Sequence, residues 1–135
     1  MSLTAKLMVG LRGIAREEVT ASNTAVAYGS GNINVFATPA MVGLMEKAAL
    51  GSVDPLLPEG YTTVGIRVDV EHIAATPVGG RVETRSELTE IDGRRLVFKV
   101  EAYDDRELVG RGTHERFIVA TEKFLQKVAG KRSAG

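Results

Sequence analysis

The feature that most constrains the fold of this chain is a long apolar helix, predicted over residues 39–50 or a little further, which contains most of the stretch FATPAMVGLMEKAAL. Pro39 suits the first helical position, and Thr38 suits the N-cap position before it. Glu46 and Lys47 are the only charged residues in this stretch, so the predicted helix has almost no polar face. We therefore expect the rest of the chain to enclose the helix on most of its sides.

Four stretches in which apolar and polar residues alternate come after the helix, a pattern typical of strands with one buried face. We predict these strands over residues 62–75, 81–91, 96–102 and 108–119. Asp92 and Gly93 are a favoured pair for a two-residue hairpin turn between the second and the third. A helix followed by an antiparallel meander indicates an α+β fold with a curved sheet wrapped around a long central helix, because each can bury the apolar surface of the other.

The two ends of the chain are less strongly patterned. Residues 10–20 are compatible with a strand, and residues 22–34 are rich in Gly, Asn and Ser, which predicts a loop. A short amphipathic helix is predicted over residues 121–128, and the basic tail at 129–135 is expected to fray. Because the chain has 135 residues and no internal repeat, we expect residues 1–135 to form a single domain.

The composition excludes several classes of function. Seventeen basic residues balance 17 acidic ones, so no overall positive field attracts nucleic acid or an anionic membrane surface. The chain contains no cysteine, which excludes disulfides, thiolate catalysis and Cys-rich zinc sites. The apolar run near the N-terminus is too short for a signal peptide or a membrane span. We therefore expect a cytoplasmic protein with neither nucleic acid nor membrane as a partner.

Glu46 interrupts the apolar pattern of the predicted helix. Its neighbours on the helix surface include Val42, Ala49 and Leu50, and none of them is a cation. Burying an unpaired carboxylate costs on the order of several kcal/mol, so a buried Glu46 needs a partner from elsewhere in the fold. The alternative is that Glu46 lies at the edge of the apolar stripe and reaches water.

His72 interrupts the apolar face of the first strand after the helix. That predicted inward face comprises Val64, Ile66, Val68 and Val70. His72 continues their register where a valine is expected, so its side chain points inward. An inward histidine can be a hydrogen-bonded core residue. Pairing with Glu46 would instead satisfy both residues and make His72 a general base.

Thr38 also has two interpretations. Its hydroxyl can cap the helix, or it can donate a proton where the free N–H groups of the first turn stabilise an oxyanion. Thr38 and Glu46 are separated by about 12 Å along an ideal helix, so the substrate, the histidine or a second subunit must bridge them. On the last strand, Gly110 and Gly112 indicate either a bulge or the close approach of another backbone or a ligand. His114 has no second histidine at metal-ligand spacing, so no metal site is expected.

The order of these motifs resembles a known family. The helix MVGLMEKAA, the stretch VEHIAATPVGGRV, the hairpin EIDGRRLVFKVEAYDD and the strand GRGTHERFIV resemble the fluoroacetyl-CoA thioesterase-like family of hotdog-fold thioesterases. The resemblance covers residues 10–127. It implies a hotdog fold, a homodimer formed by edge-to-edge pairing of two sheets, and a site at the dimer interface. It also implies an acyl-CoA substrate without any other cofactor or metal.

The resemblance assigns residues as well. The catalytic threonine, glutamate and histidine of the family match Thr38, Glu46 and His72, and positions near the substrate match Gly65 and Arg116. The implied reaction is hydrolysis of a small acyl-CoA thioester to free acid and CoA. The acyl group stays open, because YGSGNINVF before the threonine is shorter than the lid of the fluoroacetate-specific member. The alternative is a non-catalytic acyl-CoA binding or sensing module, since fold alone does not assign function.

Overall fold

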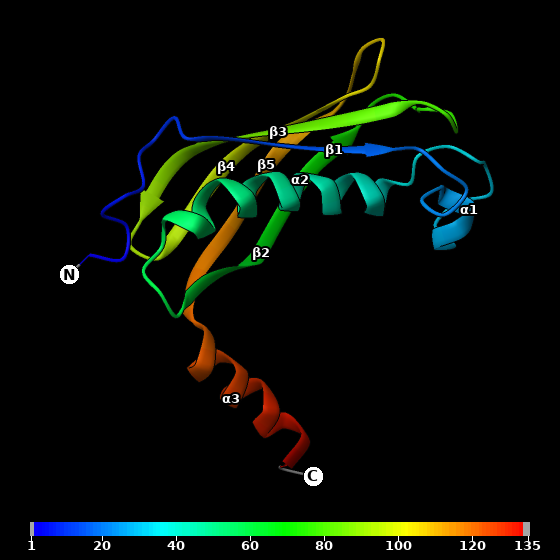
Figure 1. The fold of residues 1–135 in the computed structure, drawn as a ribbon. Helices are drawn as coiled ribbons and strands as arrows, with labels where there is room; N and C mark the ends of the chain where they lie inside the picture. Colours follow the sequence, from blue (N-terminus) through cyan, green and yellow to red (C-terminus); the bar gives the residue numbers. More distant parts are fainter. Residues whose placement is uncertain (1, 134–135) are drawn as a thin grey trace.

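A computed structural model of the chain describes residues 2–133. Five antiparallel strands form one curved sheet in the order β1-β3-β4-β5-β2, and helix α2 lies along its concave side (Figure 1). The strands are β1 (Arg12–Glu18), β2 (Tyr61–His72), β3 (Arg81–Asp92), β4 (Arg95–Tyr103) and β5 (Leu108–Ala120). The helical elements are α1 (Ala25–Tyr28), α2 (Thr38–Val53), the 3₁₀ turn η1 (Asp54–Leu56) and α3 (Thr121–Ser133). The predicted α+β arrangement of a curved sheet around a long helix is confirmed.

Helix α2 starts differently from the prediction. Ala37 is its N-cap residue and Thr38 its first helical residue, so the prediction that Thr38 caps the helix is wrong. The Thr38 side chain makes no capping hydrogen bond, because its hydroxyl contacts His72 instead. The helix ends at Val53, a little beyond Leu50, in agreement with the prediction.

One face of α2 is buried against the sheet and the opposite face is exposed. The buried residues are Ala40, Met41, Leu44, Met45, Ala48, Ala49 and Val53. Pro39, Gly43, Lys47 and Leu50 lie on the other side and are exposed. The prediction of a helix enclosed on most sides is therefore wrong for the single chain, because one sheet covers only one side of a helix.

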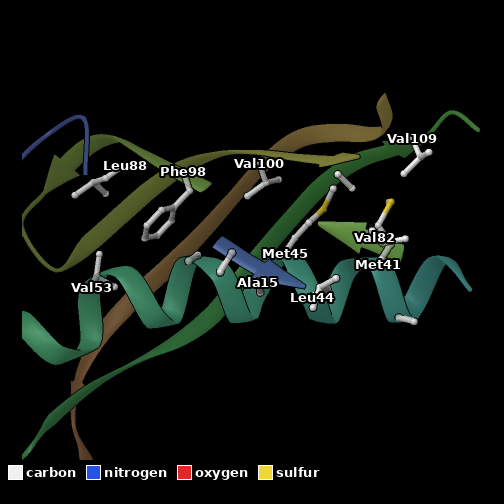
Figure 2. Close-up of a cluster of buried hydrophobic side chains, with 14 of the residues drawn as sticks. Ala15, Met41, Leu44, Met45, Val53, Val82, Leu88, Phe98, Val100 and Val109 are labelled. Atoms are coloured by element: carbon white, nitrogen blue, oxygen red, sulfur yellow. The ribbon is translucent and has the colours of Figure 1, made fainter. Parts of the chain in front are cut away.

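The hydrophobic core fills the space between α2 and the concave face of the sheet. Met41 and Met45 of the helix are buried there with Phe98 and Val100 of β4 (Figure 2). Burial of each such side chain stabilises the fold by about 1.5–3 kcal/mol. A Cβ at Gly110 would lie 2.4 Å from the Met41 Sδ atom, so the close approach predicted there is made by the core itself.

Strand β2 departs from the predicted alternation at a β-bulge. The pairing with β5 shifts register between Gly65 and Arg67, which makes Ile66 an extra residue. The helix side of the sheet carries Thr63 and the Cα atom of Gly65 before the bulge, and Val68, Val70 and His72 after it. The prediction is correct for the inward direction of His72. It is wrong for Val64, which pairs with Phe117 on the outer face.

The β3–β4 hairpin turn is displaced by one residue from the prediction. Asp92 pairs with Arg95 across the hairpin, so the two turn residues are Gly93 and Arg94. Gly93 has a φ of 60°, in the left-handed region that glycine adopts without a steric penalty. The turn therefore starts with the glycine instead of ending with it.

The predicted loop at 22–34 contains the short helix α1, and α3 is longer than predicted. Thr24 caps α1, because its hydroxyl accepts a hydrogen bond from the Ala27 amide at 3.2 Å. Helix α3 extends away from the sheet and continues to Ser133 (Figure 1). Of the tail predicted to fray, residues 134–135 lie outside the described residues. Within residues 2–133, no helix combines the length and apolar character needed to cross a bilayer.

Candidate functional site

Thr38 and His72 contact each other directly. His72 is the last residue of β2 and Thr38 the first of α2, and the Thr38 Oγ1 atom lies 2.7 Å from the His72 Nδ1 atom. Both residues line a pocket of about 340 Å³, together with Val35 and Phe36. The structure therefore brings a hydroxyl and an imidazole together at a cavity into which a small ligand could bind.

The His72 ring is suited to accept a proton. Desolvation by burial lowers the pKa of His72 below its ordinary value of 6.5, which favours the neutral imidazole. Its Nε2 atom is buried and has no hydrogen-bond partner among residues 2–133. A neutral ring with a hydroxyl on one nitrogen and an unpaired second nitrogen can act as a base, and a group from outside the chain can bind the second nitrogen.

Glu46 lies in a separate cluster. Its Oε2 atom is 3.8 Å from the Arg116 Nη1 atom, and its side chain is 40% exposed whereas that of Arg116 is 7% exposed. The predicted pairing of Glu46 with His72 is therefore wrong within the chain. About two turns of α2 separate Glu46 from the Thr38–His72 contact, and the guanidinium group is much nearer.

Gly65 is the residue of β2 that lies against Glu46. A Cβ at this position would be 2.6 Å from the Glu46 Oε2 atom, a separation that Cβ atoms do not adopt. It would also lie 3.3 Å from the His114 Cε1 atom. Any side chain at position 65 would therefore displace the carboxylate, and glycine keeps the carboxylate close to the exposed edge strand.

Arg116 is the centre of a buried polar cluster. Its Nε and Nη2 atoms donate to the hydroxyl and the carbonyl of Thr63, at 2.8 and 3.0 Å, and its Nη1 atom lies 3.1 Å from the His114 Nε2 atom. Burial lowers the pKa of Arg116, while the negative charges of Asp54 and Glu46 act in the opposite direction. The guanidinium is thus bound mainly by groups of its own chain.

His114 is a member of this cluster that the sequence-based prediction did not assign to the site. It is 1% exposed and stacks on Phe98, with ring centroids 6.1 Å apart. The alternation in GTHERF does place it on the same face as Arg116. The absence of a second histidine at metal-ligand spacing is evidence against a metal site, but not against a role for His114 in a hydrogen-bond network. Within residues 2–133, no group of three or more His, Asp or Glu residues could bind a metal ion.

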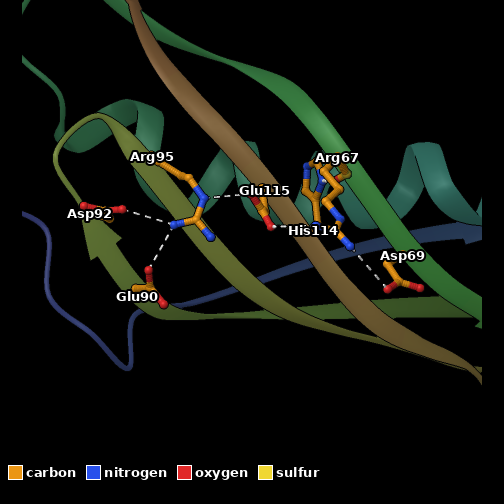
Figure 3. A network of polar contacts seen from close by, with 7 residues as sticks. All are labelled: Arg67, Asp69, Glu90, Asp92, Arg95, His114 and Glu115. Atoms are coloured by element: carbon orange, nitrogen blue, oxygen red, sulfur yellow. Dashed lines mark hydrogen bonds and ion pairs between the residues drawn. The ribbon is translucent and has the colours of Figure 1, made fainter.

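A second polar network lies on the outer face of the sheet (Figure 3). Arg95 forms ion pairs with Glu115, Glu90 and Asp92 at 2.8, 3.0 and 3.3 Å. Arg67 connects the two faces, because its side chain lies near Glu115 while its carbonyl accepts a hydrogen bond from the His114 ring at 2.8 Å. Such exposed ion pairs typically contribute about 0–1 kcal/mol each.

Comparison with known proteins identifies relatives of this chain. Residues 19–122 match the sequence profile of the fluoroacetyl-CoA-specific thioesterases. A fluoroacetyl-CoA thioesterase from Streptantibioticus cattleyicolor is 46% identical over 101 residues, which span 75% of this chain and 73% of that protein.

Solved structures agree with this result. A structure of a fluoroacetyl-CoA thioesterase has a TM-score of 0.87 and 38% identity, covering 93% of this chain and 97% of that one. A hot-dog-like protein from Thermanaerovibrio acidaminovorans has a TM-score of 0.88 and 27% identity, covering 97% of both chains. The predicted hotdog fold is thereby confirmed, and the chain belongs to the fluoroacetyl-CoA-specific thioesterase family.

Proposed function

We propose that this chain hydrolyses a small acyl-CoA thioester to free acid and CoA, at a site shared by two subunits. The observation that carries the proposal is the 2.7 Å contact between the Thr38 hydroxyl and the half-buried His72 ring, at a pocket. A thioester carbonyl is already activated and a thiolate leaves readily. The reaction therefore needs a nucleophile, a base and an oxyanion site more than it needs a strong acid.

The proposed reaction starts with neutral His72. Its Nδ1 atom takes a proton from the Thr38 hydroxyl, or from a water molecule bound next to it, while the oxygen attacks the thioester carbonyl. The electron pair of the carbonyl moves to its oxygen, and free N–H groups in the first turn of α2 stabilise that charge. The C–S bond then breaks, and His72 returns the proton to the sulfur of CoA. If Thr38 is the nucleophile, water hydrolyses the acyl-threonine ester by the same steps.

The edge strand β2 supports the proposed homodimer. It pairs with β5 on one side only, so its outer side presents unpaired backbone groups. Residues 65–69 are all exposed, and Ile66 and Val68 have exposed fractions of 51% and 40%. An exposed edge strand with apolar side chains is a template for pairing with a second copy of itself.

Antiparallel pairing of two β2 edges would join the two clusters into one site. His72 and Thr63 both face the helix side of the sheet, so antiparallel pairing can place His72 of one subunit opposite Thr63 of the partner subunit. Gly65 of the partner subunit is two residues, or about 7 Å, from that point along the strand, and Gly65 lies against Glu46 of its own chain. Glu46 of the partner subunit is then our candidate to bind the unpaired His72 Nε2 atom and orient the ring.

A complementation experiment tests the proposal. Thioesters from acetyl-CoA to hexanoyl-CoA and phenylacetyl-CoA are assayed with a thiol-reactive dye that reports free CoA. We expect turnover by the wild-type protein and large losses in His72→Ala and in Glu46→Gln. Co-refolding the two variants at equal concentration should restore about a quarter of the wild-type activity, because half of the dimers are mixed and each has one intact site.

The outcomes of this experiment separate the parts of the proposal. If the mixture recovers no activity, Glu46 and His72 act within one subunit and the shared site is wrong. If no thioester is hydrolysed by the wild-type protein, the hydrolase assignment is wrong. Tight binding of acyl-CoA without turnover would then favour a binding module.

A further inference from the structure

We infer that Asp54, acting through Thr63 and Arg116, is a positioning residue for Glu46, and that His114 completes this buried network. The inference rests on the proposed function of Glu46. It adds Asp54, Thr63 and His114 as residues that act without touching the substrate.

The direction of the hydrogen bonds identifies Asp54 as the anchor. A guanidinium group only donates, so the Thr63 hydroxyl oxygen accepts from the Arg116 Nε atom at 2.8 Å. The single proton of that hydroxyl is then available to Asp54, whose Oδ1 atom lies 2.6 Å away. The other carboxylate oxygen of Asp54 accepts from the Thr62 hydroxyl. Asp54 is the C-cap residue of α2, so the chain of hydrogen bonds begins on the same element as Glu46.

The two contacts of His114 define its protonation. A backbone carbonyl only accepts, so the ring donates from Nδ1 to the Arg67 carbonyl at 2.8 Å. The Nε2 atom must then be the unprotonated acceptor of the Arg116 Nη1 group at 3.1 Å. His114 is therefore neutral with its proton on Nδ1, and burial lowers its pKa in agreement with this state.

These contacts restrict Arg116 to one orientation. Each of its three nitrogens contacts Thr63 or His114, and its rigid plane places Nη1 at 3.8 Å from the Glu46 Oε2 atom. The resemblance implies that Arg116 contacts the substrate directly. Only 7% of its side chain is exposed, so we infer that Arg116 acts through the carboxylate of Glu46 instead. The network thus orients Glu46, whose side chain reaches the exposed edge strand.

Thr63→Val tests this role. The substitution keeps the volume of the side chain and the Thr63 carbonyl but removes the hydroxyl between Arg116 and Asp54. We expect kcat to fall about tenfold with KM changed less than about twofold, since a misplaced group lowers the rate without weakening uniform binding. Thr63→Ser retains the hydroxyl and should stay close to wild type. Asp54→Asn should lower kcat in the same direction, by a smaller factor.

The kinetic outcome distinguishes positioning from direct binding. An increase in KM with kcat unchanged would show that Arg116 binds substrate, which would overturn the inference. Unchanged kinetics in a folded Thr63→Val protein would also overturn it. Thermal unfolding of the Val and Ser variants, measured side by side, identifies any general loss of structure.

A second measurement does not depend on activity. The chain has only two histidines, so nitrogen NMR spectra of the His72→Gln variant report His114 alone. We expect the neutral tautomer with the proton on Nδ1 and no titration near 6.5, and we expect Thr63→Val to move the titration toward 6.5. Titration of His114 near 6.5, or a proton on Nε2, would refute the network even in an active enzyme. If His114 shows the expected tautomer but the protein hydrolyses no thioester, the network is correct and only the proposed function is refuted.

Discussion

The two clusters that we assign to the site differ in how their polar atoms are bonded. Around Thr38 and His72 a single hydrogen bond is present, and the His72 Nε2 atom is left without a partner among residues 2–133. Around Arg116 nearly every polar atom has a partner, and the guanidinium and the His114 ring are buried. Both contain a histidine whose pKa is lowered by burial.

This difference separates the groups that would react from the groups that would position them. The His72 ring has one hydrogen bond within the chain, so its Nδ1 atom at the pocket can exchange a proton without disrupting a network. A fully bonded buried network cannot do so without losing hydrogen bonds worth about 1–3 kcal/mol each. We therefore expect substitutions in the first cluster to act on the rate alone, and substitutions in the second to act on both rate and stability.

The largest effect is expected for His72→Gln. The variant keeps a polar side chain but has no group that can accept a proton near neutral pH, so kcat should fall by about 10²–10⁴-fold. KM and the unfolding midpoint should change little, since only the Thr38 hydrogen bond is lost. The variant is assayed for CoA release and thermal unfolding. A variant that retains half of the wild-type kcat would exclude His72 as the base.

Gly65→Ala should have the next largest effect. Its Cβ would lie 2.6 Å from the Glu46 Oε2 atom, so the carboxylate must move, and we expect kcat to fall by about tenfold to a hundredfold. Gly130→Ala is a matched control on α3, because a Cβ there meets nothing within 4 Å. The control should retain full activity. Equal activity in both variants would indicate that Glu46 has no fixed position in the reaction.

Acid pH should destabilise the fold through His114. Its pKa is lowered by burial in the folded protein, whereas the unfolded chain titrates near 6.5 and binds the proton more readily. The free energy of unfolding should therefore be constant above pH 6.5 and should decrease as the pH falls below it. Urea unfolding between pH 8 and pH 5 measures this slope. His114→Phe should reduce the slope without abolishing it, because burial lowers the pKa of His72 as well. An unchanged slope would show that His114 does not contribute.

The smallest effect is expected for Arg95→Ala in the outer network. Its ion pairs are partly exposed, so the loss should cost about 1 kcal/mol or less in unfolding free energy. CoA release should be unchanged, because Arg95 lies on the face of the sheet opposite to α2. A large loss of activity here would show that the two faces of the sheet are coupled through Arg67. The groups that affect the rate would then not be limited to the two clusters on the helix side.

Part of the site could be predicted from residue patterns alone. Period-2 alternation correctly points His72 inward, and the apolar helix makes Glu46 conspicuous. The comparisons confirm the resemblance to the thioesterase family. They also confirm the expectation of an acyl-CoA thioesterase, through the family to which the chain belongs. The catalytic roles of Thr38, Glu46 and His72 stay predictions.

Other features were not predictable in this way. The bulge at Ile66 reverses which residues of β2 face the helix, and isoleucine at that position does not predict a bulge. The burial of Arg116 depends on partners that are far away in the chain, Thr63 among them at a separation of 53 residues. The prediction that Glu46 binds His72 is wrong within the chain for the same reason, because the partner of Glu46 in space, Arg116, is 70 residues away in the sequence.

The sequence by itself determined the long helix, the four strands that follow it, their order and the side of the sheet on which His72 lies, because helix and strand periodicity depend on residues a few positions apart. Only the tertiary structure decided that Thr38 contacts His72 and that Arg116 contacts Glu46. Those contacts depend on strand register and on where α2 crosses the sheet. A shift of one residue in register would change every one of them.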